Sequence, residues 1–137
     1  MSAQRHIRSE RGQAAVEFAL VLPLLLVLFL GIIEFGIVFN HYVTLTDATR
    51  VGARKAITMR IGGTTPADAT QAVRDAAGDL DQGQLNVNVD DPSDPNFQTA
   101  GSQITVTATY PYQIDIPLLG LSLMSGTLTS TAEERLE

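Results

Sequence analysis

Hydrophobic and polar positions divide the chain into an apolar N-terminal segment and a longer segment of mixed pattern. Residues 18–39 are rich in Leu, Val, Phe and Ile, and Pro23 and Glu34 are the exceptions. A helix of this length crosses a hydrocarbon core of about 30 Å. The pattern therefore predicts one transmembrane helix over residues 18–39.

The flanks of this apolar run decide between a permanent anchor and a cleaved secretory signal, which also begins basic and becomes apolar. The run is too long for such a signal, and the bulky, polar sequence Asn40-His41-Tyr42 follows it instead of a small-x-small cleavage site. Three arginines precede the run, while two arginines and a lysine follow it between residues 50 and 55. Because the N-terminal charges lie closer to the run and emerge first, we expect a cytoplasmic N-terminus and an extracytoplasmic C-terminal domain.

Helical periodicity continues beyond the apolar run. No proline occurs from Asn40 to Arg60, and a stripe of mostly small residues recurs at helical spacing: Leu45, Ala48, Gly52, Ala56 and Met59. Three small members of this stripe, Ala48, Gly52 and Ala56, lie four residues apart and leave a groove that another helix or a sheet can approach closely. We expect one long helix over residues 13–61, ended by the two glycines at 62–63.

The remainder of the chain changes from helical to alternating pattern. Thr65-Pro66-Ala67-Asp68 predicts an N-cap, a first-turn proline and a capping acid for a short helix that Gly83 closes. Alternating residues predict half-buried strands at 85–89 and 104–110, the second continuing to 116 across a bend at Pro111. A weaker pattern at 127–135 predicts a last strand. The expected fold class is α+β: a long N-terminal transmembrane helix whose outer half packs on a small antiparallel sheet of three or four strands, plus one short helix.

Composition limits the partners and the size of the exported part. The chain has 137 residues, a net charge of −6 and no cysteine, so one small domain must hold together without disulfides. The first twelve residues carry a net charge of +2 and the remainder −8. This acidic remainder excludes nucleic-acid binding through general electrostatic attraction.

The residues of the C-terminal part give little support for catalysis or a cofactor. No phosphate-binding glycine loop, histidine metal motif or Ser/His/Asp arrangement is present in the sequence, and His41 lies just past the membrane segment, so we expect neither a catalytic site nor a metal site. Five acids are oxygen ligands of the type that calcium takes, but their spacing favours a solvated turn: Asp79, Asp81, Asp90, Asp91 and Asp94. The apolar residues 118–124 are too short for a second span. They are expected to be core beneath a loop, or less often a contact patch for a partner.

A glycine and a glutamate define the junction between the basic start and the apolar run. An ionised carboxylate in hydrocarbon costs about 2.5 kcal/mol or more, so Glu17 must lie at the interface or have a partner. A cut after Gly12 would create an ammonium at Gln13, four residues from Glu17, which could pair with Glu17 of a neighbouring subunit. Glycine before the cut suits an extended backbone in a protease site. The alternative is that Glu17 lies at headgroup depth without a function.

Two residues inside the apolar run each allow two interpretations. Glu34 lies near the outer end of the run, where water or headgroups can solvate it, or it makes an assembly contact with a partner subunit. Pro23 can kink the helix without consequence, or locally open it and ease extraction of the subunit from the membrane.

Three motifs together resemble the TadE-like family, which comprises pilin-like minor proteins of the tight-adherence (Tad) pilus. They cover the first third of the chain: Gly12-Gln13-Ala14-Ala15-Val16-Glu17-Phe18, Gly31-Ile32-Ile33-Glu34-Phe35-Gly36 and Ala48-Thr49-Arg50-Val51-Gly52-Ala53-Arg54. The resemblance places Glu17 at the fifth mature position. The aromatic residue that follows it is Phe18, where major pilins often have tyrosine. The chain is also longer than a Tad major pilin, which favours a minor role.

The resemblance implies a pseudopilin precursor with a leader at 1–12, a long helix at 13–61 and a small extracytoplasmic domain at 62–137. A prepilin peptidase would cut between Gly12 and Gln13, and Glu17 and Phe18 would act in assembly. The implied partners are other Tad pseudopilins, the major pilin, the inner-membrane assembly platform and membrane lipid. The alternative from the residues alone is an uncleaved, membrane-tethered binding or scaffolding module.

Overall fold

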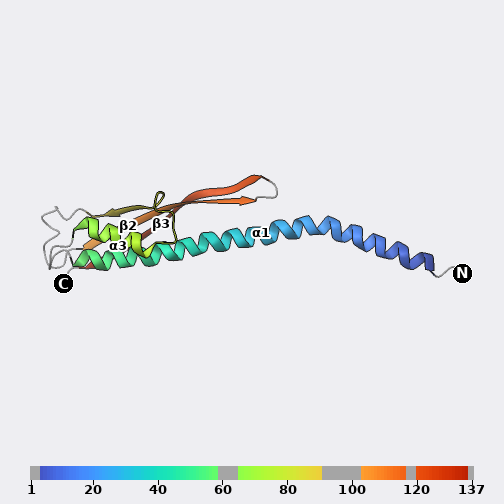
Figure 1. The fold of residues 1–137 in the computed structure, drawn as a ribbon, viewed down its shortest axis with the longest axis horizontal. Helices are drawn as coiled ribbons and strands as arrows, with labels where there is room; N and C mark the ends of the chain where they lie inside the picture. The colour runs from blue at the N-terminus through green and yellow to red at the C-terminus, as the bar shows by residue number, and fades with distance from the viewer. Residues whose placement is uncertain (1–3, 59–64, 91–102, 117–119, 136–137) are drawn as a thin grey trace.

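The structure is a computed structural model that describes residues 4–58, 65–90, 103–116 and 120–135. Its elements follow in the order α1 (Gln4–Ile57), α3 (Pro66–Ala76), β1 (Asn86–Val89), β2 (Gln103–Ile116) and β3 (Leu121–Arg135). Figure 1 shows α3 and the sheet gathered around the C-terminal half of α1, while the N-terminal half of this helix extends alone. The expected α+β, pilin-like fold class is therefore confirmed, with three antiparallel strands.

Helix α1 is longer than the sequence pattern predicts, because it already begins at Gln4 and runs through Gly12 without interruption. Pro23 lies inside it. A proline removes one backbone hydrogen bond and its ring crowds the preceding turn, so it bends a helix without always ending it. Figure 1 shows α1 changing direction within its N-terminal half, the half that contains this proline. Met59 and the glycines at 62–63 lie outside the described residues.

The start of α3 follows the predicted capping chemistry. The Thr65 hydroxyl accepts the Asp68 backbone N–H at 3.3 Å, and the Asp68 carboxylate accepts the Thr65 backbone N–H at 2.6 Å. These reciprocal bonds satisfy two of the donors that every helix start leaves unpaired. The predicted end was wrong: the helix stops at Ala76, with Ala77 as its C-cap, and Gly83 lies in a later turn.

The sheet has the order β1-β2-β3, and both pairings are antiparallel. Strand β1 pairs with β2 only from Val106 to Thr109, whereas β2 and β3 pair along their whole lengths. Pro111 does not end β2. At this position β2 already extends past β1 and has one open edge, and an open edge tolerates a residue that lacks an N–H.

The core lies between one face of the sheet and the two helices. Alternate residues of β2 from Ile104 to Tyr110 point inward, and all are at least nine-tenths buried. Facing them are mostly small residues of α1 and α3, all buried: Leu45, Ala48, Thr49, Ala53, Ala56, Ala69 and Val73. Because these side chains are short, the helices lie close to each other and to the sheet, so small residues set the spacing of the layers.

The apolar segment at 118–124 differs from its predicted place beneath a loop. Leu123 and Met124 belong to β3, and their side chains are 60% and 57% exposed. They lie where β2 and β3 continue past β1 as a two-stranded hairpin, beyond the reach of the core. The core prediction was therefore wrong for these two residues, while residues 117–119 lie outside the described part of the chain.

Candidate functional site

The junction predicted from the sequence lies in the free half of α1. From Gly12 to Leu26 every residue is exposed, including Glu17 and Phe18, and the Phe18 side chain is 60% exposed. A Cβ atom added to Gly12 would have nothing within 4 Å. The whole junction is therefore accessible to another protein or to lipid, and nothing in the described domain blocks the bond after Gly12.

Gln13 and Glu17 are already paired in the uncut chain. The Gln13 side-chain amide donates a hydrogen bond to Glu17 Oε1 at 3.1 Å, one helical turn away. The two side chains thus share one face of α1, as residues four apart do in a helix. The spacing predicted this shared face but not the hydrogen bond, whose donor is the side-chain amide of Gln13 and not its backbone nitrogen.

Glu34 has a different environment from Glu17. It belongs to a row of half-buried residues at helical spacing along α1: Val27, Leu30, Gly31, Glu34, Val38 and His41. This row leads into the fully buried Leu45 and Ala48 and is therefore on the side of α1 that faces the sheet. Glu17 and Glu34 were both predicted as assembly residues, but their environments differ: Glu17 is exposed and Glu34 is partly covered.

His41 marks the place where α1 meets the sheet. Its ring packs against the Tyr110 ring edge-to-face, with centroids 5.5 Å apart and planes at 77°. The Tyr110 hydroxyl accepts the Asp81 backbone N–H at 3.4 Å, which joins the strand to the loop after α3. The aromatic contact gives His41 a structural role at this interface. The sequence held a usable signal, because His41 lies four residues before Leu45 on the same helix face.

The small-residue stripe provides the closest approach between α1 and α3. Ala48, Gly52 and Ala56 are all buried. A Cβ atom at Gly52 would overlap with Val73 Cγ2, and would lie 3.4 Å from the Ala69 carbonyl oxygen and 3.5 Å from Val106 Cγ1. Gly52 therefore touches α3 and the sheet at once, and any larger residue must push one of them away.

Acids of the C-terminal domain are used in local structure. Asp81 accepts hydrogen bonds from the Gln84 side chain at 2.8 Å and the Gly83 backbone N–H at 2.9 Å, which together lower its pKa below the ordinary value. Asp90 accepts the Thr105 backbone N–H at 3.1 Å. Among the described residues no cluster of His, Asp or Glu could hold a metal ion. Asp91 and Asp94 lie outside the described part.

A shallow, open depression borders α3 and is lined by polar residues that include Arg74 and Asp75. Arg74, one of its lining residues, donates to the carbonyl oxygens of Gln82 at 3.0 Å and Leu85 at 3.2 Å. Its guanidinium therefore holds the turn after α3 in place. The large exposed apolar side chains of the described chain, in contrast, lie mostly on α1, from the N-terminal junction onward.

A comparison with known proteins finds a match in the same N-terminal part of the chain. Residues 12–54 match the family model described as TadE-like protein, a range that begins at the junction glycine and ends three residues before α1 does. The curated proteins and the solved structures gave no match. In the described residues one helix, within Gly12–Ile57, is long and apolar enough to cross a membrane, which fits a single-pass anchor.

The match includes Gly12, Glu17, Glu34 and the stripe glycine Gly52, and leaves out α3 and the sheet. The TadE-like family is associated with the Tad pilus, so the match implies a minor pilin-like role. Residues 12–54 are similar to the TadE-like family, which confirms the resemblance drawn from the motifs for that segment.

Proposed function

We propose that this chain is the precursor of a pseudopilin that a prepilin peptidase cuts after Gly12 and that acts in the assembly or initiation of a Tad pilus. The observation that carries the proposal is the accessible junction at the start of the TadE-like segment, where Glu17 is exposed and hydrogen-bonded to Gln13. The proposed membrane orientation has the N-terminus in the cytoplasm, because the basic residues before the apolar run favour that side.

Cleavage would change the charge at this junction. Removal of residues 1–12 takes away a net charge of +2 and creates one ammonium at Gln13. Glu17 would then lie one turn from that ammonium on its own helix and could reach the ammonium of an adjacent subunit. Since an unpaired carboxylate in hydrocarbon costs about 2.5 kcal/mol or more, such pairing favours one axial position of neighbouring helices over others.

Cleavage also requires a local change of structure. Gly12 is inside α1, and a protease acts on extended backbone, so the helix has to unwind around this residue. Glycine lowers helix stability by about 1 kcal/mol relative to alanine, which makes opening easier at Gly12 than at the residues on either side of it. Gly12 would therefore assist processing in two ways, through its small size and through its weak preference for helix.

The exposed half of α1 would supply the contacts with partners. Its large apolar side chains project on all sides between Val16 and Leu26. They suit contact with lipid before assembly, and contact with the helices of other Tad pseudopilins, the major pilin and the assembly platform afterwards. Glu34 stays a candidate for a partner contact. Because it is half-buried on the sheet-facing side of α1, we expect it to contribute less to partner binding than Glu17.

A second candidate function is an uncleaved, membrane-tethered scaffolding module. The uninterrupted helix from Gln4 through Gly12 favours it, since a continuous helix resists proteolysis. N-terminal peptide mapping of the protein from its native membranes, with and without the prepilin peptidase, separates the two. A peptide that begins at Gln13 only when the peptidase is present supports the pseudopilin. An intact N-terminus in both strains would overturn it.

The role of Glu17 requires a second experiment. Glu17→Gln keeps the size of the side chain and removes its charge, so we expect normal cleavage and a loss of most surface pili. Asp47→Asn is the matched control, because Asp47 is an exposed carboxylate on the same helix, 68% accessible and 3.5 Å from Arg50. Equal piliation in Glu17→Gln and Asp47→Asn would contradict the proposed pairing.

A further inference from the structure

The hairpin formed by β2 and β3 continues well past the core. From Tyr110 to Ile116, β2 pairs with β3 alone, because β1 pairs no further than Thr109. We call this two-stranded extension, residues 110–116 and 121–128, the arm. Figure 1 shows the arm passing α3 and β1 and running alongside α1 toward its N-terminal half.

Side-chain contacts make the arm an ordered element. The Tyr112 ring lies over Gly126 on the paired strand: a Cβ atom at 126 would be 2.9 Å from Tyr112 Cε1. Near the tip, Asp115 Oδ1 accepts hydrogen bonds from the Ser122 hydroxyl at 2.7 Å and the Gln113 amide at 2.9 Å. The Ser122 bond joins β3 to β2 beside the shift of register between Ile114 and Asp115, whereas the Gln113 bond lies within β2.

The arm reaches the apolar segment of α1. Ile116, at the end of β2, is only 3% exposed, although it lies far from the core cluster along the strand. The half-buried row on α1 extends in the same direction, through Val38 and Glu34 to Val27. The end of the arm therefore lies at the level where α1 passes from the domain into its free, apolar half.

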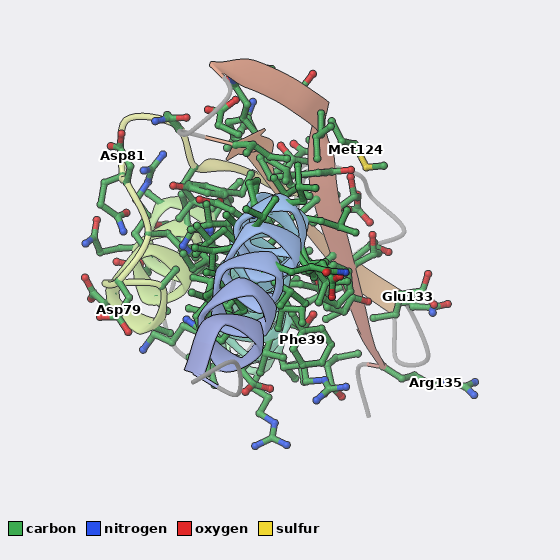
Figure 2. The ribbon with its side chains drawn as sticks, turned by 90° about the vertical axis from the view of Figure 1, so that its right-hand side faces the viewer. Phe39, Asp79, Asp81, Met124, Glu133 and Arg135 are labelled. Atoms are coloured by element: carbon green, nitrogen blue, oxygen red, sulfur yellow. The ribbon has the colours of Figure 1, made fainter. Side chains whose placement is uncertain are left out.

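The tip of the arm exposes apolar side chains instead of polar ones. Leu123 and Met124 are 60% and 57% exposed, and the sequence from Ile116 to Met124 contains no charged residue. Figure 2 shows Met124 projecting from β3 on the side away from α1. At the other end of β3, Glu133 and Arg135 are charged. The apolar surface is thus confined to the end of the arm that points toward the membrane segment.

We propose that the tip of the arm is a second membrane contact, in which Leu123 and Met124 dock on lipid at the outer interface of the bilayer that α1 spans. The proposal rests on the anchoring of α1 and is independent of cleavage after Gly12. Along the axis of α1, the tip lies at the same height as the start of the apolar surface of this helix. The outer surface of a bilayer that surrounds α1 would therefore contact the tip.

The depth of the contact follows from the backbone of the arm. The arm has open strand edges, and unpaired N–H and C=O groups cost several kcal/mol each in hydrocarbon, so it cannot enter the bilayer core. It can lie among the headgroups, where water and lipid oxygens satisfy these groups. The outer boundary of the core then crosses α1 near Val27, where the half-buried row ends, and a short span of about 17 residues begins near Arg11. Phe39 would lie outside the hydrocarbon.

The chain has no cysteine, so single-cysteine labelling of the full-length protein gives a direct test. The probe is an environment-sensitive fluorophore on Leu123→Cys, in vesicles of phosphatidylethanolamine and phosphatidylglycerol. Thr129→Cys is the matched control, an exposed position on the same strand nearer the core. We expect a blue-shifted emission at 123 that lipids brominated near the headgroup quench strongly, and an unshifted, unquenched emission at 129.

Two further measurements keep the proposal falsifiable. Met124→Cys repeats the test if Leu123→Cys fails to fold. Phe39→Cys should react with a membrane-impermeant maleimide, whereas Leu20→Cys, exposed on the free half of α1, should not. Equal hydration of the labels at 123 and 129, or a protected Phe39→Cys, would overturn the proposed contact and boundary. A blue shift at 123 that disappears on dilution of the protein in lipid would also overturn it, because the tip would then contact a second copy.

Discussion

The two halves of α1 follow opposite rules of composition within one uninterrupted helix. Between Gly12 and Leu26 all residues are exposed, and most are large and apolar. Between Leu45 and Ala56 the residues that face the domain are buried and, apart from Leu45 itself, small. Large exposed apolar residues are stable only in lipid or against other subunits, whereas small buried ones permit close packing within the chain. The first half of α1 therefore depends on contacts with lipid or other subunits, and the second half depends on packing within its own chain.

Glycines show this difference most directly. Gly31 and Gly36 have nothing within 4 Å of an added Cβ atom, while the same atom at Gly52 overlaps with Val73 and approaches Val106. A glycine in the middle of a helix destabilises it by about 1 kcal/mol relative to alanine. This cost is offset at Gly52 by the contact with α3 and the sheet, and no such contact within the described chain offsets it at Gly31 or Gly36.

The largest expected effect comes from Gly52→Leu compared with Gly36→Leu. Overpacking a close helix contact costs about 1–3 kcal/mol and occasionally more, and a leucine at 52 must displace α3 or β2. We expect the domain of Gly52→Leu to unfold or to melt far below the wild type, and Gly36→Leu to melt like the wild type. Circular dichroism of the full chain in detergent micelles measures both. Equal melting temperatures would contradict the division of α1 into two halves.

A substitution that creates a cavity in the core should give the next largest loss of stability. Ile104 is fully buried on β2, so Ile104→Ala should destabilise the domain by about 2–5 kcal/mol. Ile32→Ala removes the same atoms from a side chain that is 63% exposed on the free half of α1, and should leave domain unfolding unchanged. Chemical denaturation in micelles, followed by tyrosine fluorescence, tests the pair. A similar loss in both variants would mean that the free half is part of the folding unit.

The smallest effect concerns the cap of α3 and depends on pH. Hydrogen bonds from the Thr65 backbone and side chain lower the pKa of Asp68 below its ordinary value of 3.8. A lowered folded-state pKa stabilises the fold above the unfolded-state pKa, and this contribution is lost as pH falls through the folded value. We therefore expect the wild type to lose stability below about pH 4 more steeply than Asp68→Asn.

Thermal melts of the wild type and Asp68→Asn at a series of acidic pH values measure this difference. Asp47→Asn, which removes an exposed carboxylate from α1, is the control and should keep the slope of the wild type. If Asp68→Asn also kept that slope, the cap would contribute nothing to the packing of α3 on the second half of α1.

Local signals in the sequence predicted the features that depend on neighbours along the chain. The apolar run, the four-residue spacing of the small stripe and the Thr65–Asp68 cap each follow from helix geometry, and the structure has all three. The junction was likewise visible, because Gly12 and Glu17 lie at a fixed spacing before the run. Their roles in cleavage and assembly stay predictions.

The arm was not predictable in the same way. Residues 118–124 are apolar, and the usual inference from an apolar segment is burial in the core. Whether Leu123 and Met124 are buried depends on how far β2 and β3 extend past β1, which the pairing of distant strands determines. The same limit applies to Glu34: its half-burial follows from the position of a hairpin that lies far away in the sequence.

Because α1 is continuous, the number of residues between Glu17 and the domain determines the direction in which Glu17 points relative to the sheet. Each residue of a straight helix turns the chain by about 100°, so an unbroken helix from Gln13 to Ala56 fixes the azimuth of Glu17 relative to the sheet. An assembly that orients Glu17 toward a neighbour therefore also chooses which side of the domain that neighbour meets. The bend in the half that contains Pro23 sets the tilt of the N-terminal part of α1 relative to the domain. The number of residues between the junction and the domain sets the direction around the helix axis in which Glu17 points.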